Sequence, residues 1–216
     1  VWSMYDYNRG CCDNICYSGV ADIFRLPKFS LSFFRTQIAE GSMLPSGKMP
    51  YEVFIPAYRD EILSDTVMVY GNVDEVELVL NGKTIRRQTA DKGPDSDYIP
   101  VPNGGNGKNL HFPPFTFYGV PKERGVLKAV GYHQGKKVAE YTVKTPGVPE
   151  RLDITYFESG KPATKNDLLI VYVRMLDKQG VLCPVNGIPV ELSVQGGEIV
   201  GPTSYPLEAG VASFLV

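Results

Sequence analysis

Residues 75–88 constrain this chain most strongly, because they carry the pattern of a β-hairpin. In Glu75–Leu80, apolar residues occupy every second position, which is the period of a strand with one buried face. Asn81-Gly82 follows, and a second strand pattern covers Lys83–Gln88. Asn and Gly both accept positive φ, so this dipeptide between two strand patterns predicts a tight hairpin turn.

Similar short strand patterns surround this hairpin. They cover residues 51–55, 67–71, 115–117, 126–131 and 137–143, with a turn at Gln134-Gly135. The segment Asp91–Asn109 is polar and rich in Gly and Pro, and it is interpreted as a long loop. About seven short strands with regular turns predict an immunoglobulin-like sandwich.

A second set of strand patterns follows the short, stiff linker at residues 145–149. Its predicted strands cover residues 152–157, 168–176, 188–194 and 211–216, with the turn Asp-Lys-Gln-Gly at residues 177–180. No fixed sequence period relates the two sets. We expect this second sandwich to lack its last strand and to leave an unpaired edge where another copy could pair.

The first 40 residues carry a different pattern from the rest. Val1–Tyr7 is predicted to form a strand, Asn8–Gly19 a polar loop, and Ser30–Ala39 a helix that stops at Gly41. Residues 41–50 are rich in Gly, Pro and Ser and are interpreted as a linker or surface loop. One strand-loop-helix unit cannot bury itself, so we expect it to be the end of a larger α/β domain.

Composition and charge exclude several classes of function. The formal net charge is −2 and the sequence contains no basic block, which argues against a partner held by phosphate neutralisation. No apolar run approaches the roughly 20 residues that a membrane-spanning helix needs. The 22 Gly, 17 Pro and 13 Tyr suit many short strands joined by turns.

The four cysteines, Cys11, Cys12, Cys16 and Cys183, do not have zinc-ligand spacing. A structural zinc site favours paired C-x2-C units or a nearby His, and the two His residues, His111 and His133, fall in the first predicted sandwich. We therefore interpret the cysteines as free or loosely paired thiols and expect no metal and no cofactor. The pattern leaves open whether Cys11 and Cys16 pair, so it does not define a redox compartment.

Three segments together resemble the C-terminal part of glycoside hydrolase family 2 enzymes of the β-galactosidase kind. WSMYDYNRG, SGVADIFRLPKFS and SFFRTQ are similar to the eighth strand, loop and helix of the catalytic barrel. DEVELVLNGKTIRRQ and GVLKAVGYHQGKKVAEYTVKTPG resemble the immunoglobulin-like domain that follows it, and DLLIVYVRMLDKQGVLCPVNGIPVELSVQGGEIVG resembles the last such domain. The predicted fold is mainly β: a (β/α)8-barrel remnant at residues 1–40, an immunoglobulin-like β-sandwich at 41–147, and a second, truncated one at 148–216.

The resemblance also implies where the chemistry would lie. Retaining glycosidases use two carboxylates, which in this family lie on the fourth and seventh barrel strands, so both are expected upstream and this chain alone is predicted to be inactive. The resemblance implies sugar contacts by Trp2, Asn8, Asp13 and Ser18. Trp2 is as readily a core residue of the barrel, and Ser18 stands where well-known members have an Asn.

The remaining polar residues of the opening stretch are predicted to be structural. We expect Asp6 to orient backbone groups and Asp22 to pair with Arg25 or another neighbour. Arg25 and Lys28 match an R-x-P-K pattern and are expected to close the loop against the barrel.

Two functions fit these patterns. In the first, the chain is part of a carbohydrate-degrading β-galactosidase in the periplasm or outside a bacterium, with a β-galactoside as partner and self-association through the barrel surface or an unpaired edge. In the second, it is a carbohydrate-binding or adhesion module without catalysis. A row of exposed aromatics such as Tyr118 and Tyr132 on one sandwich face would favour the second function.

Overall fold

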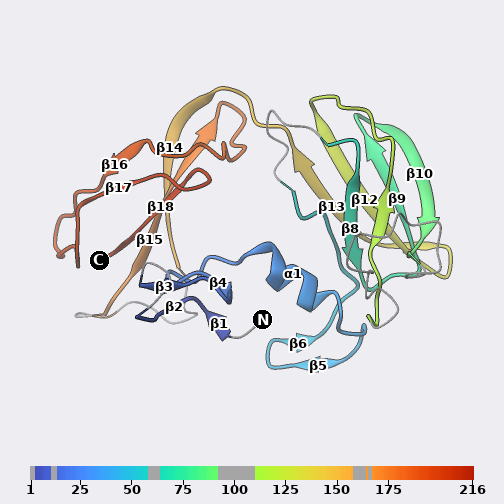
Figure 1. Cartoon of the computed structure of the whole chain (residues 1–216), viewed down its shortest axis with the longest axis horizontal. Coiled ribbons are helices and arrows are strands. Elements are labelled where there is room, and N and C mark those ends of the chain that lie inside the picture. Colours follow the sequence, from blue (N-terminus) through green and yellow to red (C-terminus); the bar gives the residue numbers. More distant parts are fainter. Residues whose placement is uncertain (1–2, 11–13, 58–63, 92–109, 158–163, 165–166) are drawn as a thin grey trace. The chain divides into compact units, whose positions relative to one another are not determined.

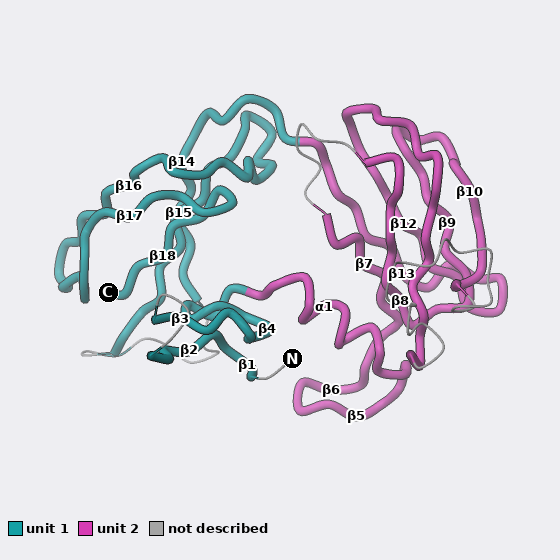
Figure 2. Tube along the Cα trace, viewed as in Figure 1, with its two compact units in different colours: residues 1–26, 146–216 teal, residues 27–145 magenta. Residues whose placement is uncertain are grey.

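The computed structural model describes residues 3–10, 14–57, 64–91, 110–157, 164 and 167–216 and is mainly β (Figure 1). Its contacts divide the chain into two compact units, residues 1–26 with 146–216, and residues 27–145 (Figure 2). The predicted domain bounds at residues 40 and 147 stay predictions, because a compact unit is defined by contacts and not by independent folding.

The hairpin predicted from the strongest pattern is present in the second of these units. Strand β9 (Glu75–Leu80) pairs with β10 (Lys83–Thr89) in an antiparallel register. Asn81 and Gly82 have φ values of 51° and 80°, which is the backbone that a type I′ turn requires. Val76, Leu78 and Leu80 are buried, so the alternation marks the face of β9 that points into the core.

Seven strands of this unit form two sheets. Besides β9 and β10 they are β7 (Val53–Phe54), β8 (Val67–Gly71), β11 (Phe115–Phe117), β12 (Val126–His133) and β13 (Lys136–Lys144). One sheet has the order β10-β9-β12-β13 and the other has the order β11-β8-β7. A core that includes Val69, Leu78, Phe115 and Leu127 fills the space between the sheets, so the predicted seven-strand sandwich is confirmed.

The segment that precedes this sandwich differs from the prediction. Helix α1 (Phe29–Arg35) begins and ends earlier than predicted, and none of its residues is buried. Its last turn is completed by the hydroxyl of Thr36, which donates to the Phe33 carbonyl at 2.8 Å. The predicted linker at residues 41–50 contains a small hairpin, β5 (Met43–Leu44) with β6 (Gly47–Lys48).

A buried asparagine fastens this segment to the sandwich. Asn72 follows β8 directly, and its side-chain amide donates to the carbonyls of Ile38 and Pro50, both at 3.0 Å. Its side-chain oxygen accepts the backbone N–H of Glu52 at 2.6 Å. One side chain therefore satisfies three backbone groups that lie 20 to 34 residues before it in the chain, as a buried polar group requires.

The opening residues form short strands where a single strand and a loop were predicted. Strand β1 (Ser3–Tyr5) pairs in parallel with β4 (Gly19–Ala21), and between them β2 (Tyr7–Asn8) pairs with β3 (Ile15–Cys16) as a hairpin. The predicted loop therefore contains β3 and the start of β4. Residues 11–13 of that loop lie outside the described residues, as do most of the predicted loop at 91–109 and the predicted strand residue Val1.

The described part of the second sandwich has five strands in two layers. One sheet has the order β14 (Pro149–Tyr156), β15 (Ile170–Asp177), β18 (Val211–Leu215), and the other pairs β16 (Pro189–Glu191) with β17 (Ser204–Pro206). The strand predicted at 188–194 is shorter, and β17 was not predicted. Its core includes Val173, Val190, Leu207 and Phe214.

Candidate functional site

Of the four residues expected to contact sugar, the structure describes Asn8 and Ser18; Trp2 and Asp13 lie outside the described residues. Asn8 is exposed at the end of β2, where it pairs with Ile15. Ser18 is half-buried immediately before β4. The two are linked through Cys16, which contacts the Ser18 hydroxyl at 3.5 Å and pairs with Tyr7, the neighbour of Asn8.

Asp6 holds the two parallel strands of this segment together. Its buried carboxylate accepts the backbone N–H of Gly19 at 2.9 Å, and its own N–H donates to the Ala21 carbonyl at 2.9 Å. The prediction that Asp6 orients backbone groups is therefore confirmed. Because Gly19 follows Ser18 directly and is the first residue of β4, the Asp6 carboxylate also fixes the position of the backbone next to Ser18.

The thiol of Cys16 has a polar environment. Hydrogen bonds with Ser18 and then Tyr7 lower the pKa of the Cys16 thiol, because they stabilise the thiolate. Cys16 and Cys183 are both free, and Cys183 is buried, which raises the pKa of its thiol. The described residues contain no group of His, Cys, Asp and Glu that could hold a metal ion.

The loop after β4 is closed by its own side chains. The Asp22 carboxylate accepts the backbone N–H of Leu26 at 2.8 Å, so the predicted pairing with a neighbour is confirmed. The guanidinium of Arg25 lies 5.0 Å from the ring centre of Tyr5 and 5.9 Å from that of Phe157. Arg25 thus joins the opening strands to the second sandwich through cation–π contacts.

A cavity of ≈ 320 Å³ lies beside this loop, between residues 6–26 and the strands β17 and β18. Its lining combines apolar groups such as Phe24 and Val211 with the acidic residues Asp6, Asp22 and Glu208. The lining residues that the structure describes include no Lys or Arg. The sequence carried no signal for this cavity, because its two walls are separated by nearly the whole chain.

One exposed aromatic beside the candidate residues was not singled out from the sequence. Tyr17 lies between Cys16 and Ser18, and its side chain is 70% exposed. Tyr17 could have been identified from the sequence as a candidate residue, because it is an aromatic residue within a mostly polar, Cys-containing loop.

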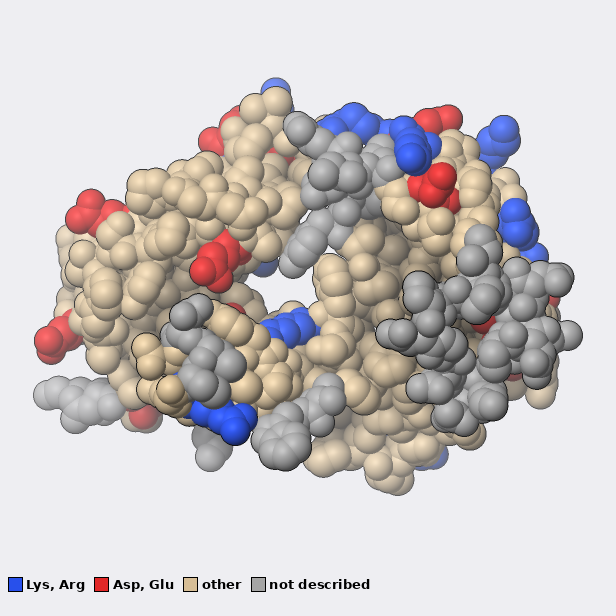
Figure 3. All heavy atoms as spheres, viewed as in Figure 1, with Lys and Arg blue, Asp and Glu red and all other residues tan. Residues whose placement is uncertain are grey.

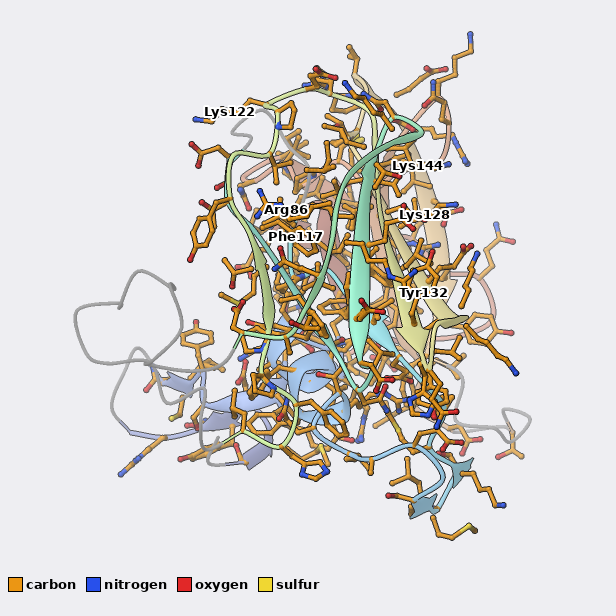
Figure 4. All side chains as sticks on the ribbon, turned by 90° about the vertical axis from the view of Figure 1, so that its right-hand side faces the viewer. Arg86, Phe117, Lys122, Lys128, Tyr132 and Lys144 are labelled. Carbon is orange, nitrogen blue, oxygen red and sulfur yellow. The ribbon has the colours of Figure 1, made fainter. Side chains whose placement is uncertain are left out.

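The outer face of the first sandwich does not carry the aromatic row that an adhesion module would show. Lys128 and Tyr132 follow each other along β12 (Figure 4). The Tyr132 ring is covered by the guanidinium of Arg87 at 3.7 Å, and its hydroxyl donates to Glu77 at 2.6 Å. Across the described residues of both sandwiches, the exposed aromatics form no continuous row.

The hydrogen bonds around Tyr132 also shift its titration. Glu77 accepts from the hydroxyls of Tyr132 and Thr84, both at 2.6 Å, and these bonds lower the pKa of the Glu77 carboxyl. The same bond to Glu77, followed by burial, raises the pKa of Tyr132. These side chains form a cross-strand network in which the carboxylate of Glu77 accepts both hydroxyl hydrogen bonds. The network therefore has a structural role.

Charged residues of both signs are scattered over the surface in Figure 3, and no field of one sign extends across that face. The visible pattern agrees with the small net charge of −2. None of the helices among the described residues has the length and apolar character to cross a membrane.

Known proteins match the chain along nearly its whole length. Residues 64–139 match the family described as "Domain of unknown function (DUF4982)". A β-galactosidase of Thermoanaerobacter pseudethanolicus is 33% identical over 97% of this chain and 28% of its own length. A β-galactosidase of Rhizobium radiobacter is 30% identical over 49% of this chain and 76% of its own length.

A solved β-glucuronidase of glycoside hydrolase family 2 matches the fold, with a TM-score of 0.73 at 21% identity over 98% of this chain and 21% of its own. Together these matches show a β-rich region that is shared with longer proteins named as β-galactosidases and a β-glucuronidase. The chain belongs to glycoside hydrolase family 2 and corresponds to the C-terminal region of its β-galactosidase and β-glucuronidase members. It spans 28% of the length of the Thermoanaerobacter enzyme.

Proposed function

We propose that this chain is the C-terminal part of a retaining β-galactosidase whose two catalytic carboxylates lie in polypeptide outside these 216 residues. The observation that carries the proposal is the 33% identity to a β-galactosidase over 97% of the chain. The described geometry supports it, because two of the described acids of the opening segment accept backbone N–H groups: Asp6 accepts that of Gly19 and Asp22 that of Leu26.

In this proposal the opening segment forms part of the wall of the sugar site. Asn8 presents a polar side chain at the end of β2 and Ser18 presents one immediately before β4, and Trp2 and Asp13 complete the set as the resemblance implies. Asp6 positions Ser18 through Gly19 and does not itself act on substrate. Ser has a shorter reach than the Asn that well-known members carry at position 18, which argues against a direct contact there. Asn8 and Asp13 are weaker candidates than Trp2 and Ser18.

The β-galactosidase assignment is tested in a chimera with the Thermoanaerobacter enzyme. Its matching C-terminal region is replaced by residues 1–216, and hydrolysis of chromogenic β-galactosides and β-glucuronides is measured. We expect hydrolysis of the β-galactoside and a rise in KM on Asn8→Ala. A folded chimera that cleaves only the glucuronide would refute the proposed specificity.

Inactivity of the isolated chain is tested separately. The 216-residue protein is incubated with a chromogenic β-galactoside beside buffer alone, and no hydrolysis above buffer is expected. Hydrolysis that survives repurification and disappears on Asp6→Asn or Asp22→Asn would show that these acids are catalytic.

The proposal also covers the domain organisation of the chain and the cellular location of the protein. We assign residues 1–40 to the end of the catalytic barrel, 41–147 to a first and 148–216 to a second, truncated immunoglobulin-like domain, and we place the protein in the periplasm or outside a bacterial cell. The Thermoanaerobacter and Rhizobium relatives are bacterial, which supports the bacterial origin. An adhesion role is not favoured, because Arg87 covers the ring of Tyr132.

A further inference from the structure

The loop that follows β4 has a strained backbone. Arg25 has a φ of 70°, in the left-handed region that costs a residue other than glycine backbone energy. Within the loop, the Arg25 N–H donates to the Asp22 carbonyl at 3.0 Å, and the Leu26 N–H donates to the Asp22 carboxylate at 2.8 Å. Such a backbone persists only where the surrounding structure determines it, which makes the contacts of this loop with the rest of its unit important.

Tyr172 of the second sandwich supplies one of these contacts. It lies on the central strand β15, and its neighbours Val171 and Val173 pack into the core of the sandwich. Side chains alternate between the two faces of a strand, so Tyr172 points to the opposite, outer face. There its hydroxyl donates to the Phe24 carbonyl at 2.7 Å, and the residue is only 8% exposed. The outer face of β15 is therefore in contact with the loop after β4.

The groups around Tyr172 keep its hydroxyl in the form that donates. Burial and then the Asp22 carboxylate raise the pKa of Tyr172, and Arg25 opposes them. Arg25 also reaches the second sandwich, because its guanidinium lies 5.9 Å from the ring centre of Phe157, which follows β14 directly. The loop is thus attached to the second sandwich by a hydrogen bond at Phe24 and a cation–π contact at Arg25.

This loop continues directly into the strands beside the candidate sugar contacts. Strand β4 begins immediately after Ser18 and ends immediately before Asp22. It pairs in parallel with β1, which lies between Trp2 and Asp6 in the sequence, and the pair is held where the Gly19 N–H donates to the Asp6 carboxylate. Because β4 is only three residues long, a shift of the loop at its end is transmitted to its start and to β1.

We propose that Tyr172 is a positioning residue for the sugar site: its hydroxyl holds the loop after β4 and thereby fixes the wall that carries Trp2, Asn8 and Ser18. This inference rests on the proposed function, because it assigns the opening segment to the sugar site. The second sandwich then has a definite task in the reaction, which is to position that wall without touching the substrate.

The variant Tyr172→Phe removes the hydroxyl and keeps the ring. In the chimera with the Thermoanaerobacter enzyme, we expect it to raise KM for a chromogenic β-galactoside at least threefold and to change kcat less than twofold, because a displaced wall weakens sugar binding. A purely structural role would lower the amount of folded enzyme, and with it the apparent kcat, at unchanged KM. That result would overturn the inference.

Tyr132→Phe is the matched control for this measurement. Tyr132 belongs to the other compact unit (Figure 2), and its hydroxyl makes a comparable bond, to Glu77 at 2.6 Å. The control removes the same kind of hydrogen bond away from the opening segment, so we expect it to leave KM unchanged. A rise in KM equal to that of Tyr172→Phe would also overturn the inference.

Hydrogen exchange of the 216-residue chain tests the same contact without catalysis. The amide of Gly19 reports on β4, because it is hydrogen bonded to Asp6. We expect Tyr172→Phe to speed its exchange at least threefold and Tyr132→Phe to leave it unchanged, and equal exchange in the wild type and Tyr172→Phe would overturn the inference. A folded chimera that cleaves no β-galactoside, together with faster Gly19 exchange in Tyr172→Phe, would refute the proposed function while supporting the positioning of β4 by Tyr172.

Discussion

Gly19 is a residue at which the structure leaves no room for a side chain. A Cβ there would lie 2.3 Å from the backbone nitrogen of Asp6 and 2.3 Å from the carbonyl carbon of Tyr5. Because both are backbone atoms held by the parallel pairing, Gly19→Ala should destabilise the fold by at least about 2 kcal/mol. Gly10→Ala is the matched control, since nothing lies within 4 Å of its Cβ position. Denaturant unfolding measures both variants, and equal stability would contradict the predicted clash.

Asp177 is the residue whose ionisation should matter most to the second sandwich. Its buried carboxylate accepts the backbone N–H groups of Gly147 at 2.7 Å and of Gln179 and Val181 at 2.8 Å. These bonds, that of Gly147 first, lower the pKa of Asp177 below its ordinary value of 3.8. The stability they confer is present above the unfolded pKa and is lost as pH falls through the lower folded pKa.

We therefore expect Asp177→Asn to lower the thermal midpoint of the second sandwich at pH 7. The Asn side chain offers one acceptor oxygen where the carboxylate offers two, so the bond to Gly147 or those to the turn must weaken. Midpoints are measured from pH 7 to pH 3, and the gap between the two proteins should narrow below about pH 4. A gap that stays constant over this range would mean that the charge of Asp177 does not contribute.

At the scale of elements, two hairpin turns of the first sandwich offer a matched comparison. Asn81 and Gln134 each precede a Gly and have positive φ values of 51° and 49°. Only for Asn81 does the structure record side-chain bonds, one to the Arg124 carbonyl at 3.0 Å and one from the Val126 N–H at 2.9 Å.

Replacement of each turn residue by Gly should therefore have different effects on the stability of the sandwich. Asn81→Gly loses two hydrogen bonds and should destabilise the sandwich by about 1–2 kcal/mol. Gln134→Gly relieves the left-handed backbone strain of a non-glycine residue and should be neutral or slightly stabilising. Urea unfolding compares the two, and a stabilising Asn81→Gly would show that the side-chain bonds contribute nothing.

The elements that were predicted well and badly differ in what stabilises them. Strands β9 and β12 carry enough alternation and turn chemistry for local sequence to define them. Helix α1 has seven residues and none is buried, so burial of an apolar face does not define its ends, and the sequence pattern predicted a longer helix over Ser30–Ala39. Strand β17 is three residues long and depends on its pairing with β16, which local sequence does not encode.

At the scale of the molecule, the two units have separate hydrophobic cores of different size. Among the described residues, thirteen buried side chains form the core of the first sandwich and five form that of the second. We expect the smaller core to unfold first, with Leu78→Ala and Phe214→Ala each destabilising its own unit by about 2–5 kcal/mol. Hydrogen exchange of each unit measures this, and equal loss of protection in both units from either variant would contradict separate cores.

At the candidate site, too, local sequence predicted some residues, whereas other features depend on contacts between distant segments. The backbone role of Asp6 was predicted from its place at a strand end and is confirmed. The sugar contacts of Trp2, Asn8, Asp13 and Ser18 come from the family resemblance and all stay predictions, and Trp2 and Asp13 also lie outside the described residues. The cavity that joins Asp22 to Glu208, and the contact of Arg25 with Phe157, depend on segments more than 100 residues apart and carry no local signature.

Local sequence was sufficient to predict the mainly β class, the seven-strand first sandwich, its Asn-Gly and Gln-Gly turns and the membership of glycoside hydrolase family 2, because period-two burial, turn chemistry and family motifs are local properties. Contacts between distant segments, which no local pattern encodes, bring Asn72 to the backbone of Ile38, Pro50 and Glu52. They also leave Leu152, Ile154 and Tyr156 of β14 exposed among the described residues. Both features depend on which distant segments come into contact. The free energy of such a contact arises from the interaction of two segments, so neither segment's sequence predicts it alone.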